Sequence, residues 1–396
     1  MNYEITNLRV TEKATSKLHL KQLLLLILST IFIPAAYVYV SAILISELLS
    51  KKVSINKQFS SLLIYAYMLI GLTASEYKLV SAFFVLLIFL CCYSYNLFSA
   101  AESDCMEAAV KLFYLVSMVV FFIGVLQYIN PEFTIPSKWV SSSYSVNKRI
   151  YSTFFNPNVF GFYINFIILL SIEKLNFKKP GLELIIFSAG IFCLFLTFSR
   201  TAWISIVAAL IITSLFNRKR LKFALIISLA IFCLDALLGT GRANPSNAVA
   251  DSSFLYRIEV WKACIEIIKD NFISGIGFGT LSKHIADYST VVSTGIEHSH
   301  SIYLQVFTET GILGFSLFII LLLNIIKFFK NNLFKKHNSH FITAFSVFVM
   351  TMIHGLVDSV PLTPQIMMIL SIYAGIISSL HTFERSNKSI KLPLIN

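Results

Sequence analysis

Two histidines lie in the segment Glu297-His298-Ser299-His300-Ser301, which leads directly into a long apolar run. An imidazole has an ordinary pKa near 6.5, so a histidine at this position is suited to take a proton from a hydroxyl group at neutral pH. A histidine that only forms hydrogen bonds at the membrane boundary is the commoner structural alternative. We expect His300 to be a catalytic base, with His298 either replacing it or shaping the loop.

Several basic side chains border apolar runs or an amphipathic segment on one predicted side of the membrane: Lys78, Arg149, Arg200 and Arg257. Any one of them alone is more often a snorkelling anchor. Four together, on a side where basic residues are normally depleted, indicate an anionic partner such as a lipid pyrophosphate, which arginine contacts in a bidentate manner. Asp358 is expected to orient a base or a cation, the alternative being an ordinary carboxylate at a helix end.

The composition indicates that these residues are held by a membrane protein. Of 396 residues, 56% are hydrophobic and 13% are charged, whereas soluble domains carry about 25% charged residues. The mean hydropathy is +0.76. The bilayer is therefore the expected solvent for most of the chain.

Apolar runs long enough to cross a hydrocarbon core recur from end to end. We predict an all-α polytopic membrane protein with about 12 transmembrane helices. The first two runs are alternatively one long helix kinked at Pro34. The predicted spans lie near residues 20–33, 35–49, 59–73, 79–98, 108–129, 159–172, 182–198, 201–216, 221–238, 302–329, 341–357 and 365–383.

Lysine and arginine fall in alternate breaks between these runs, and short basic loops stay in the cytoplasm. Both termini are therefore predicted to be cytoplasmic, and the net charge of +12 is explained by topology, because no nucleic-acid-binding motif accompanies it. The outer, periplasmic face then receives two long loops, near 130–158 and 239–301. The predicted organisation is 1–238 with about nine helices, 239–301 as a large periplasmic loop, and 302–396 with about three helices and a cytoplasmic tail.

The large loop contains an amphipathic segment at 254–268. Its apolar positions recur at helical spacing: Phe254, Ile258, Trp261, Ile265 and Ile268. This pattern predicts a helix that lies along the membrane surface. The glycine-rich run 275–279 follows as a flexible turn and lacks the strand and helix context of a nucleotide-binding loop.

The six cysteines show neither a Cys-X-X-Cys pair nor the spacing of metal ligands. We expect no disulfide framework, no metal and no cofactor. The polar, mixed-charge residues 1–19 lack the features of a secretory signal, so we expect nothing to be removed from this end.

A longer pattern is similar to a known family. His300-Ser301, nine residues and Gly311-Ile-Leu-Gly314 fit the motif His-[Asn/Ser/Gln]-X9-Gly-X-X-Gly of the O-antigen ligase superfamily, which also holds polysaccharide polymerases and protein O-oligosaccharyltransferases. Blocks beginning at Arg149, Thr197 and Arg257 resemble the family in the same order. The resemblance covers about residues 149–373. From the residues alone, the two glycines predict close helix packing.

The resemblance implies a metal-independent, inverting transfer of a glycan from undecaprenyl pyrophosphate to an acceptor hydroxyl. In that scheme Arg149, Arg200 and Arg257 bind the pyrophosphate and His300 is the base. Lys78 and Asp358 fit by position in less specific blocks. The expected location is the bacterial inner membrane, with the active site in the periplasm and no nucleic acid as partner.

Within the superfamily we expect an O-antigen ligase acting on lipid A-core in lipopolysaccharide biosynthesis, with a repeat-unit polymerase close behind. A protein-glycosylating member is disfavoured, because those enzymes commonly carry a long C-terminal outer domain. A lipid-linked oligosaccharide flippase is the alternative from another class. Transporters often contain inverted repeats with polar residues near mid-depth, whereas the polar residues of this chain gather at one face.

Overall fold

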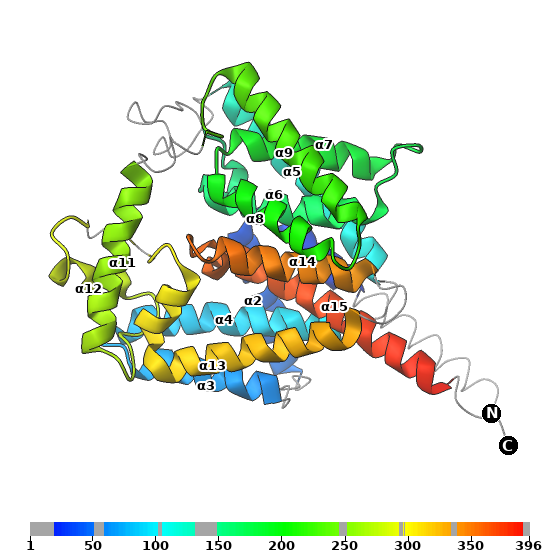
Figure 1. The fold of residues 1–396 in the computed structure, drawn as a ribbon. Helices are drawn as coiled ribbons and strands as arrows, with labels where there is room; N and C mark the ends of the chain where they lie inside the picture. The colour runs from blue at the N-terminus through cyan, green and yellow to red at the C-terminus, as the bar shows by residue number, and fades with distance from the viewer. Residues whose placement is uncertain are drawn as a thin grey trace, which may run out of the picture. The chain divides into compact units, whose positions relative to one another are not determined.

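The computed structural model describes residues 20–50, 59–101, 105–130, 149–244, 252–292, 296, 298–333 and 339–390. Every regular element in these ranges is helical, as Figure 1 shows, so the all-α prediction is confirmed for this part of the chain. Residues 131–148 of the first predicted periplasmic loop, and residues 245–251, 293–295 and 297 of the second, lie outside the described residues.

The apolar helices follow the predicted runs closely. A turn at residues 30–32 separates the first two helices, and Pro34 lies in the first turn of the second, where proline is tolerated. The helices are Leu20–Ser29, α2 (Ile33–Leu49), α3 (Phe59–Thr73), α4 (Lys78–Ser99), α5 (Cys105–Ile129), α6 (Pro157–Lys174), α7 (Leu182–Leu196), α8 (Arg200–Thr213), α9 (Lys219–Leu238), α13 (Ile302–Leu333), α14 (Ser339–His354) and α15 (Pro364–Ile390).

Among the described residues, five helices are long and apolar enough to cross a membrane. These are the segments Lys78–Ser99, Glu107–Ile129, Lys219–Leu238, Ile302–Leu333 and Pro364–Thr382. Several shorter apolar helices accompany them. The chain is thus a helical protein of membrane type, while the number of crossings and their orientation stay predictions.

The chain divides into two compact units. Unit 1 comprises Met1–Ser54, Leu90–Val120 and Met368–Asn396, and unit 2 comprises Ile55–Phe89 and Phe121–Met367. Within unit 1, the Tyr93 hydroxyl donates a 2.6 Å hydrogen bond to Glu47 Oε2, which ties α4 to α2. All the predicted site residues lie in unit 2.

At the centre of unit 2 lies α6, which is buried along nearly its whole length. A helix that is apolar on every side is stable only when other helices surround it. Helices α7, α8 and α14 pack against α6, and α9 packs against α7 and α8. Helix α13 lies beside α3 in the same unit (Figure 1).

The predicted amphipathic segment is a helix, α11 (Ser252–Asp270), followed by the short α12 (Leu281–His284). Its buried side chains belong to a core with residues from 276 to 296, and those of α11 are Val260, Ala263, Cys264 and Ile267. The predicted apolar stripe lies on another face, where Phe254 is 37% and Ile265 is 45% exposed. The helix is confirmed, and its contact with the membrane surface stays a prediction.

Helix α13 is interrupted at Gly311, whose φ of 57° and ψ of −165° are not helical. The interruption frees backbone groups, which bond to the segment after α11: Ile312 N donates to Phe272 O at 2.8 Å, and Gly277 N donates to Glu309 O at 2.8 Å. A Cβ atom on Gly311 would lie 2.4 Å from Ile273 O. The expected close approach of a helix is therefore replaced by a close approach of loop backbone at a positive-φ glycine.

Candidate active site

His300 has a positive φ of 54°, a conformation that is unusual for a residue with a side chain. Flanking backbone bonds hold it there. Ser299 N donates to Gln305 Oε1 at 2.6 Å, and Ile302 N donates to Gly355 O at 2.8 Å, which joins the start of α13 to the end of α14. Backbone strain that the surroundings enforce is often found at functional sites.

Asp358 lies at the centre of the candidate site, and its side chain is almost completely buried. Its Oδ2 atom accepts a hydrogen bond from Asn158 Nδ2 at 2.8 Å and lies 3.4 Å from Arg257 Nη2. Its Oδ1 atom lies 3.7 Å from His300 Nδ1, within ion-pair range but beyond a normal hydrogen bond. One carboxylate thus joins α6, α11 and the segment that leads into α13, and the structure brings together Arg257, His300 and Asp358, while their roles stay predictions.

The local electrostatics keep Asp358 ionised. Burial acts to raise the pKa of Asp358, but the neighbouring His300 and Arg257 outweigh it and hold the pKa well below its ordinary value. Burial, together with His300 and Arg257, lowers the pKa of His298 to about 4, against an opposing effect of Asp358. His298 is therefore neutral at pH 7, and its ring centroid lies 4.6 Å from that of His300.

Arg149 reaches this carboxylate through Asn158. Its Nη2 atom donates to Asn158 Oδ1 at 2.9 Å, while its Nε atom donates to Thr197 O at 2.8 Å. Asn158 is fixed because Asn156 caps α6 by accepting from Asn158 N at 2.8 Å, with Pro157 at the first helical position. Asn158 was not among the residues selected from the sequence, and the structure shows that it links a cation to the carboxylate.

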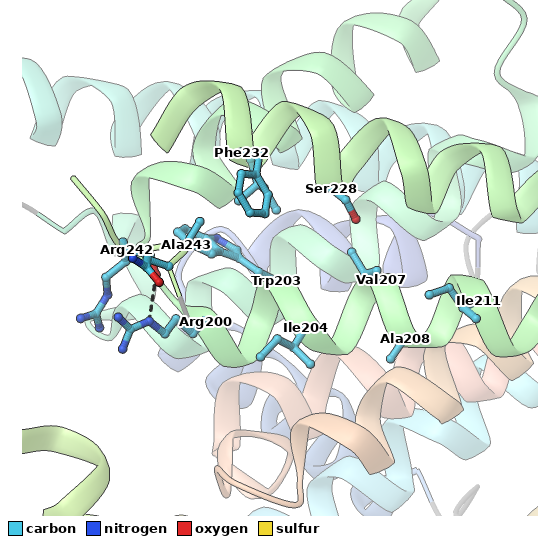
Figure 2. A pocket seen from close by; sticks show the side chains of 12 residues that line it. Arg200, Trp203, Ile204, Val207, Ala208, Ile211, Ser228, Phe232, Arg242 and Ala243 are labelled. Atoms are coloured by element: carbon cyan, nitrogen blue, oxygen red, sulfur yellow. Dashed lines mark hydrogen bonds between the residues drawn. The ribbon is translucent and has the colours of Figure 1, made fainter. Parts of the chain in front are cut away.

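Arg200 is the first residue of α8, and Ser199 caps this helix by accepting from Ala202 N. Its Nε atom donates to Arg242 O at 3.0 Å, the dashed contact in Figure 2. Arg242 Nε lies 3.5 Å from Phe198 O, next to the Thr197 carbonyl that Arg149 contacts. Arg149 and Arg242 therefore both contact carbonyl groups of the turn before α8, and Arg200 contacts Arg242. Arg242 is a further basic residue at this place that was not selected from the sequence.

Two donors in the Arg257-X3-Trp261 block lack acceptors. Arg257 Nε and Trp261 Nε1 are buried and have no hydrogen-bond partner among the described residues. A buried donor without an acceptor costs about 1–3 kcal/mol. Since both lie on α11 one turn apart, a bound anionic or hydroxyl-bearing ligand is a natural acceptor for them.

Lys78 has a local role in the structure. Its Nζ atom donates to Thr73 O at 2.8 Å and to Leu72 O at 3.3 Å, so it satisfies carbonyl groups at the end of α3. Its side chain is exposed there. The structure places no described contact between Lys78 and the group around Asp358, and a pyrophosphate role for Lys78 stays a prediction.

His298, His300 and Asp358 have ligand atoms within 4.8 Å of one another, so a metal site must be weighed. Imidazole and carboxylate are ligand types that Zn²⁺ accepts. Asp358 Oδ2, however, already contacts Asn158 and the guanidinium of Arg257, and that positive charge opposes a divalent cation at the same carboxylate. The arrangement is better suited to a base, its orienting carboxylate and an adjacent anion-binding arginine.

The comparisons with known proteins agree with the motif. The family model described as O-antigen ligase matches residues 185–319, from α7 to the middle of α13. The matched range contains Arg200, Arg257, His298 and His300, whereas Arg149 and Asp358 lie outside it. No curated protein matches the chain. The match supports the resemblance to the O-antigen ligase superfamily and a glycosyltransferase-like activity.

Proposed function

We propose, from the family match and the site geometry, that the chain transfers a polysaccharide from undecaprenyl pyrophosphate to an acceptor sugar hydroxyl at the periplasmic face of the inner membrane. The specific reaction is O-antigen ligation to lipid A-core. The observation that carries the proposal is the buried Asp358 carboxylate, which lies against both the candidate base His300 and the anion-binding Arg257.

The proton step follows from how His300 is oriented. Its Nδ1 atom faces Asp358 Oδ1, so a tautomer with the proton on Nδ1 directs the basic Nε2 lone pair away from the carboxylate. Nε2 takes the proton of the acceptor hydroxyl as that oxygen forms a bond to the anomeric carbon. Asp358 then stabilises the imidazolium ion.

The arginines assist the other half of the reaction. When the anomeric carbon separates from the pyrophosphate oxygen, negative charge develops on the leaving group, and nearby cations lower the barrier. Arg149, Arg200 and Arg257 supply that charge in the proposal, with Lys78 as a further contact. Attack opposite the leaving group in a single displacement inverts the anomeric configuration.

Two alternatives share parts of this arrangement. A repeat-unit polymerase would use the same donor site with a second lipid-linked glycan as acceptor. A flippase would bind the lipid donor but needs no base, so the strained His300 beside a buried carboxylate favours group transfer. A flippase is therefore the least favoured of the three functions.

The test is a transfer assay with the purified full-length chain and an undecaprenyl-pyrophosphate-linked glycan. Acceptors are lipid A-core in one arm and a second lipid-linked glycan in the other. We expect His300→Ala to lower transfer by about 10²–10⁴-fold while donor binding survives, with a smaller effect of His298→Ala. His381→Ala in unit 1 is the control for purification and reconstitution.

Each arm of the assay has a decisive outcome. Product on lipid A-core alone supports a ligase, and product only on the second glycan replaces it with a polymerase. Near-normal transfer by His300→Ala removes the base from the proposal. Activity that is abolished by EDTA and restored by Zn²⁺ would instead make the His298, His300 and Asp358 group a metal site.

A further inference from the structure

A groove of about 440 Å³ runs between α8 and α9 (Figure 2). Its walls are almost entirely apolar, with Trp203, Ile204 and Val207 from α8 and Ile231 and Phe232 from α9. Ile204 is 64% and Phe232 is 61% exposed, so the groove is open along its side. Its volume lies in the range of ligand sites, about 300–1,000 Å³.

One end of this groove is basic. Arg200 and Arg242 both belong to its lining, and Figure 2 shows both side chains at that end, where Arg200 Nε donates to Arg242 O at 3.0 Å. Two guanidinium groups offer several N–H donors that can form paired hydrogen bonds with an anion. The groove is thus amphipathic, with an apolar trough ending at a pair of arginines.

Arg242 is held in place by Asp235, a buried residue near the end of α9. The Asp235 carboxylate accepts hydrogen bonds from Arg242 N at 2.9 Å and from Ala243 N at 3.1 Å, and it also contacts Thr240 Oγ1. Gly239, with a φ of 60°, ends α9 and turns the chain towards this carboxylate. The backbone that carries Arg242 is therefore organised by a charged side chain.

We infer that this groove binds the polyprenyl chain of the lipid donor next to its pyrophosphate, and that Arg242 binds the pyrophosphate together with Arg200. The inference rests on the proposed function and adds a chain-binding site and one residue to it. A pyrophosphate carries more than one negative charge and matches two arginines, whereas the phosphodiester of a bulk glycerophospholipid carries one. The open side of the groove admits a chain from the bilayer.

The headgroup contact is tested by binding, measured by native mass spectrometry on the full-length protein. Probes are undecaprenyl pyrophosphate and phosphatidylglycerol. We expect Arg242→Ala to weaken undecaprenyl pyrophosphate binding by about tenfold or more, with Arg242→Lys intermediate, because a hydrogen-bonded charge contact is lost. Lys262→Ala, an exposed lysine on α11, is the matched control and should bind normally.

The chain contact is tested separately by filling the groove. Ser228 on α9 lines it, whereas the adjacent Leu229 does not and is 66% exposed. Wild type should bind undecaprenyl pyrophosphate more tightly than farnesyl pyrophosphate. Ser228→Trp should remove most of the difference in affinity between the two pyrophosphates. Leu229→Trp should leave that difference unchanged.

The outcomes separate the inference from the proposed function. Unchanged undecaprenyl pyrophosphate binding in both Arg242→Ala and Ser228→Trp, with binding still dependent on Arg257, overturns the groove and leaves the proposed function standing. Equal, Arg242-dependent binding of phosphatidylglycerol overturns the donor as occupant and makes the groove a general lipid site. Failure of the wild-type protein to prefer undecaprenyl pyrophosphate over phosphatidylglycerol contradicts the proposed function as well.

Discussion

Asp358→Asn is the change that most directly tests how the site works, because it removes one negative charge and keeps the size of the side chain. The carboxylate lies 3.7 Å from His300 Nδ1. Two unit charges at that distance interact by about 4 kcal/mol at an effective dielectric constant of about 20. This attraction acts on the imidazolium ion that forms as His300 takes the proton of the acceptor, so it lowers the barrier of the transfer step.

A loss of about 4 kcal/mol corresponds to about three powers of ten in rate. Because the His300 side chain is 19% exposed, solvent screens part of the interaction, and we expect kcat to fall by about 10²–10³-fold. The KM for the lipid donor should change less than kcat, since Arg257 contacts Asp358 but Arg149 and Arg200, the other two arginines proposed to bind the pyrophosphate, do not contact it directly. An effect confined to KM would place Asp358 in donor binding only.

The assay is transfer at a series of donor concentrations, which gives kcat and KM, on protein matched for amount and for thermal unfolding midpoint. Asp287→Asn, at an exposed position in the segment between α12 and α13, is the control and should transfer at the wild-type rate. A kcat within about tenfold of wild type in Asp358→Asn would refute the reasoning, because a charge at this distance from the base could then contribute little.

Three further changes test other parts of the structure. Arg200→Lys and Arg257→Lys should lower turnover by about tenfold or more without loss of folded protein, because an ammonium group lacks the planar fork; full activity in both would make them membrane anchors. Gly311→Ala should lower the unfolding midpoint more than Gly239→Ala does. Each substitution forces a residue with a side chain to adopt positive φ, which costs about 1–2 kcal/mol. Only at Gly311 would the new Cβ atom also clash with backbone, at 2.4 Å from Ile273 O. A cysteine at Ser246 should react with an impermeant maleimide in intact spheroplasts, and reaction only after the membrane is opened would reverse the predicted topology.

Helix positions were predictable because each apolar run is bounded by polar or turn-forming residues. Pro157 and Asn156 mark the start of α6, and Gly239 marks the end of α9. The burial of individual faces was not predictable in the same way. On α11 the apolar stripe that begins at Phe254 lies outside the core, and the smaller residues around Ala263 are buried instead. The reason is that the segments after α11 pack against the face that carries Ala263.

The candidate site was predictable as a set of residue types and not as a set of contacts. His300, Arg257 and Asp358 were selected by motif and position, and the structure makes them neighbours. Asn158 was missed as the bridge because an amide near a helix start is normally a cap, and its second role depends on α6 and the end of α14 meeting in space. Arg242 was missed because it lies in a loop without periodicity.

The break at Gly311 divides α13 into two mechanically different parts. The backbone that follows α11, the helix that carries Arg257, is bonded on both sides of the break: Gly277 N donates to Glu309 O before it, and Ile312 N donates to Phe272 O after it. The part after the break is the long apolar rod. Membrane helices adjust to bilayer thickness by tilting, and a helix bends most readily where its hydrogen-bond ladder is interrupted. We therefore expect changes in lipid thickness to tilt the part of α13 that follows Leu313, while the spacing between base and arginine stays constant.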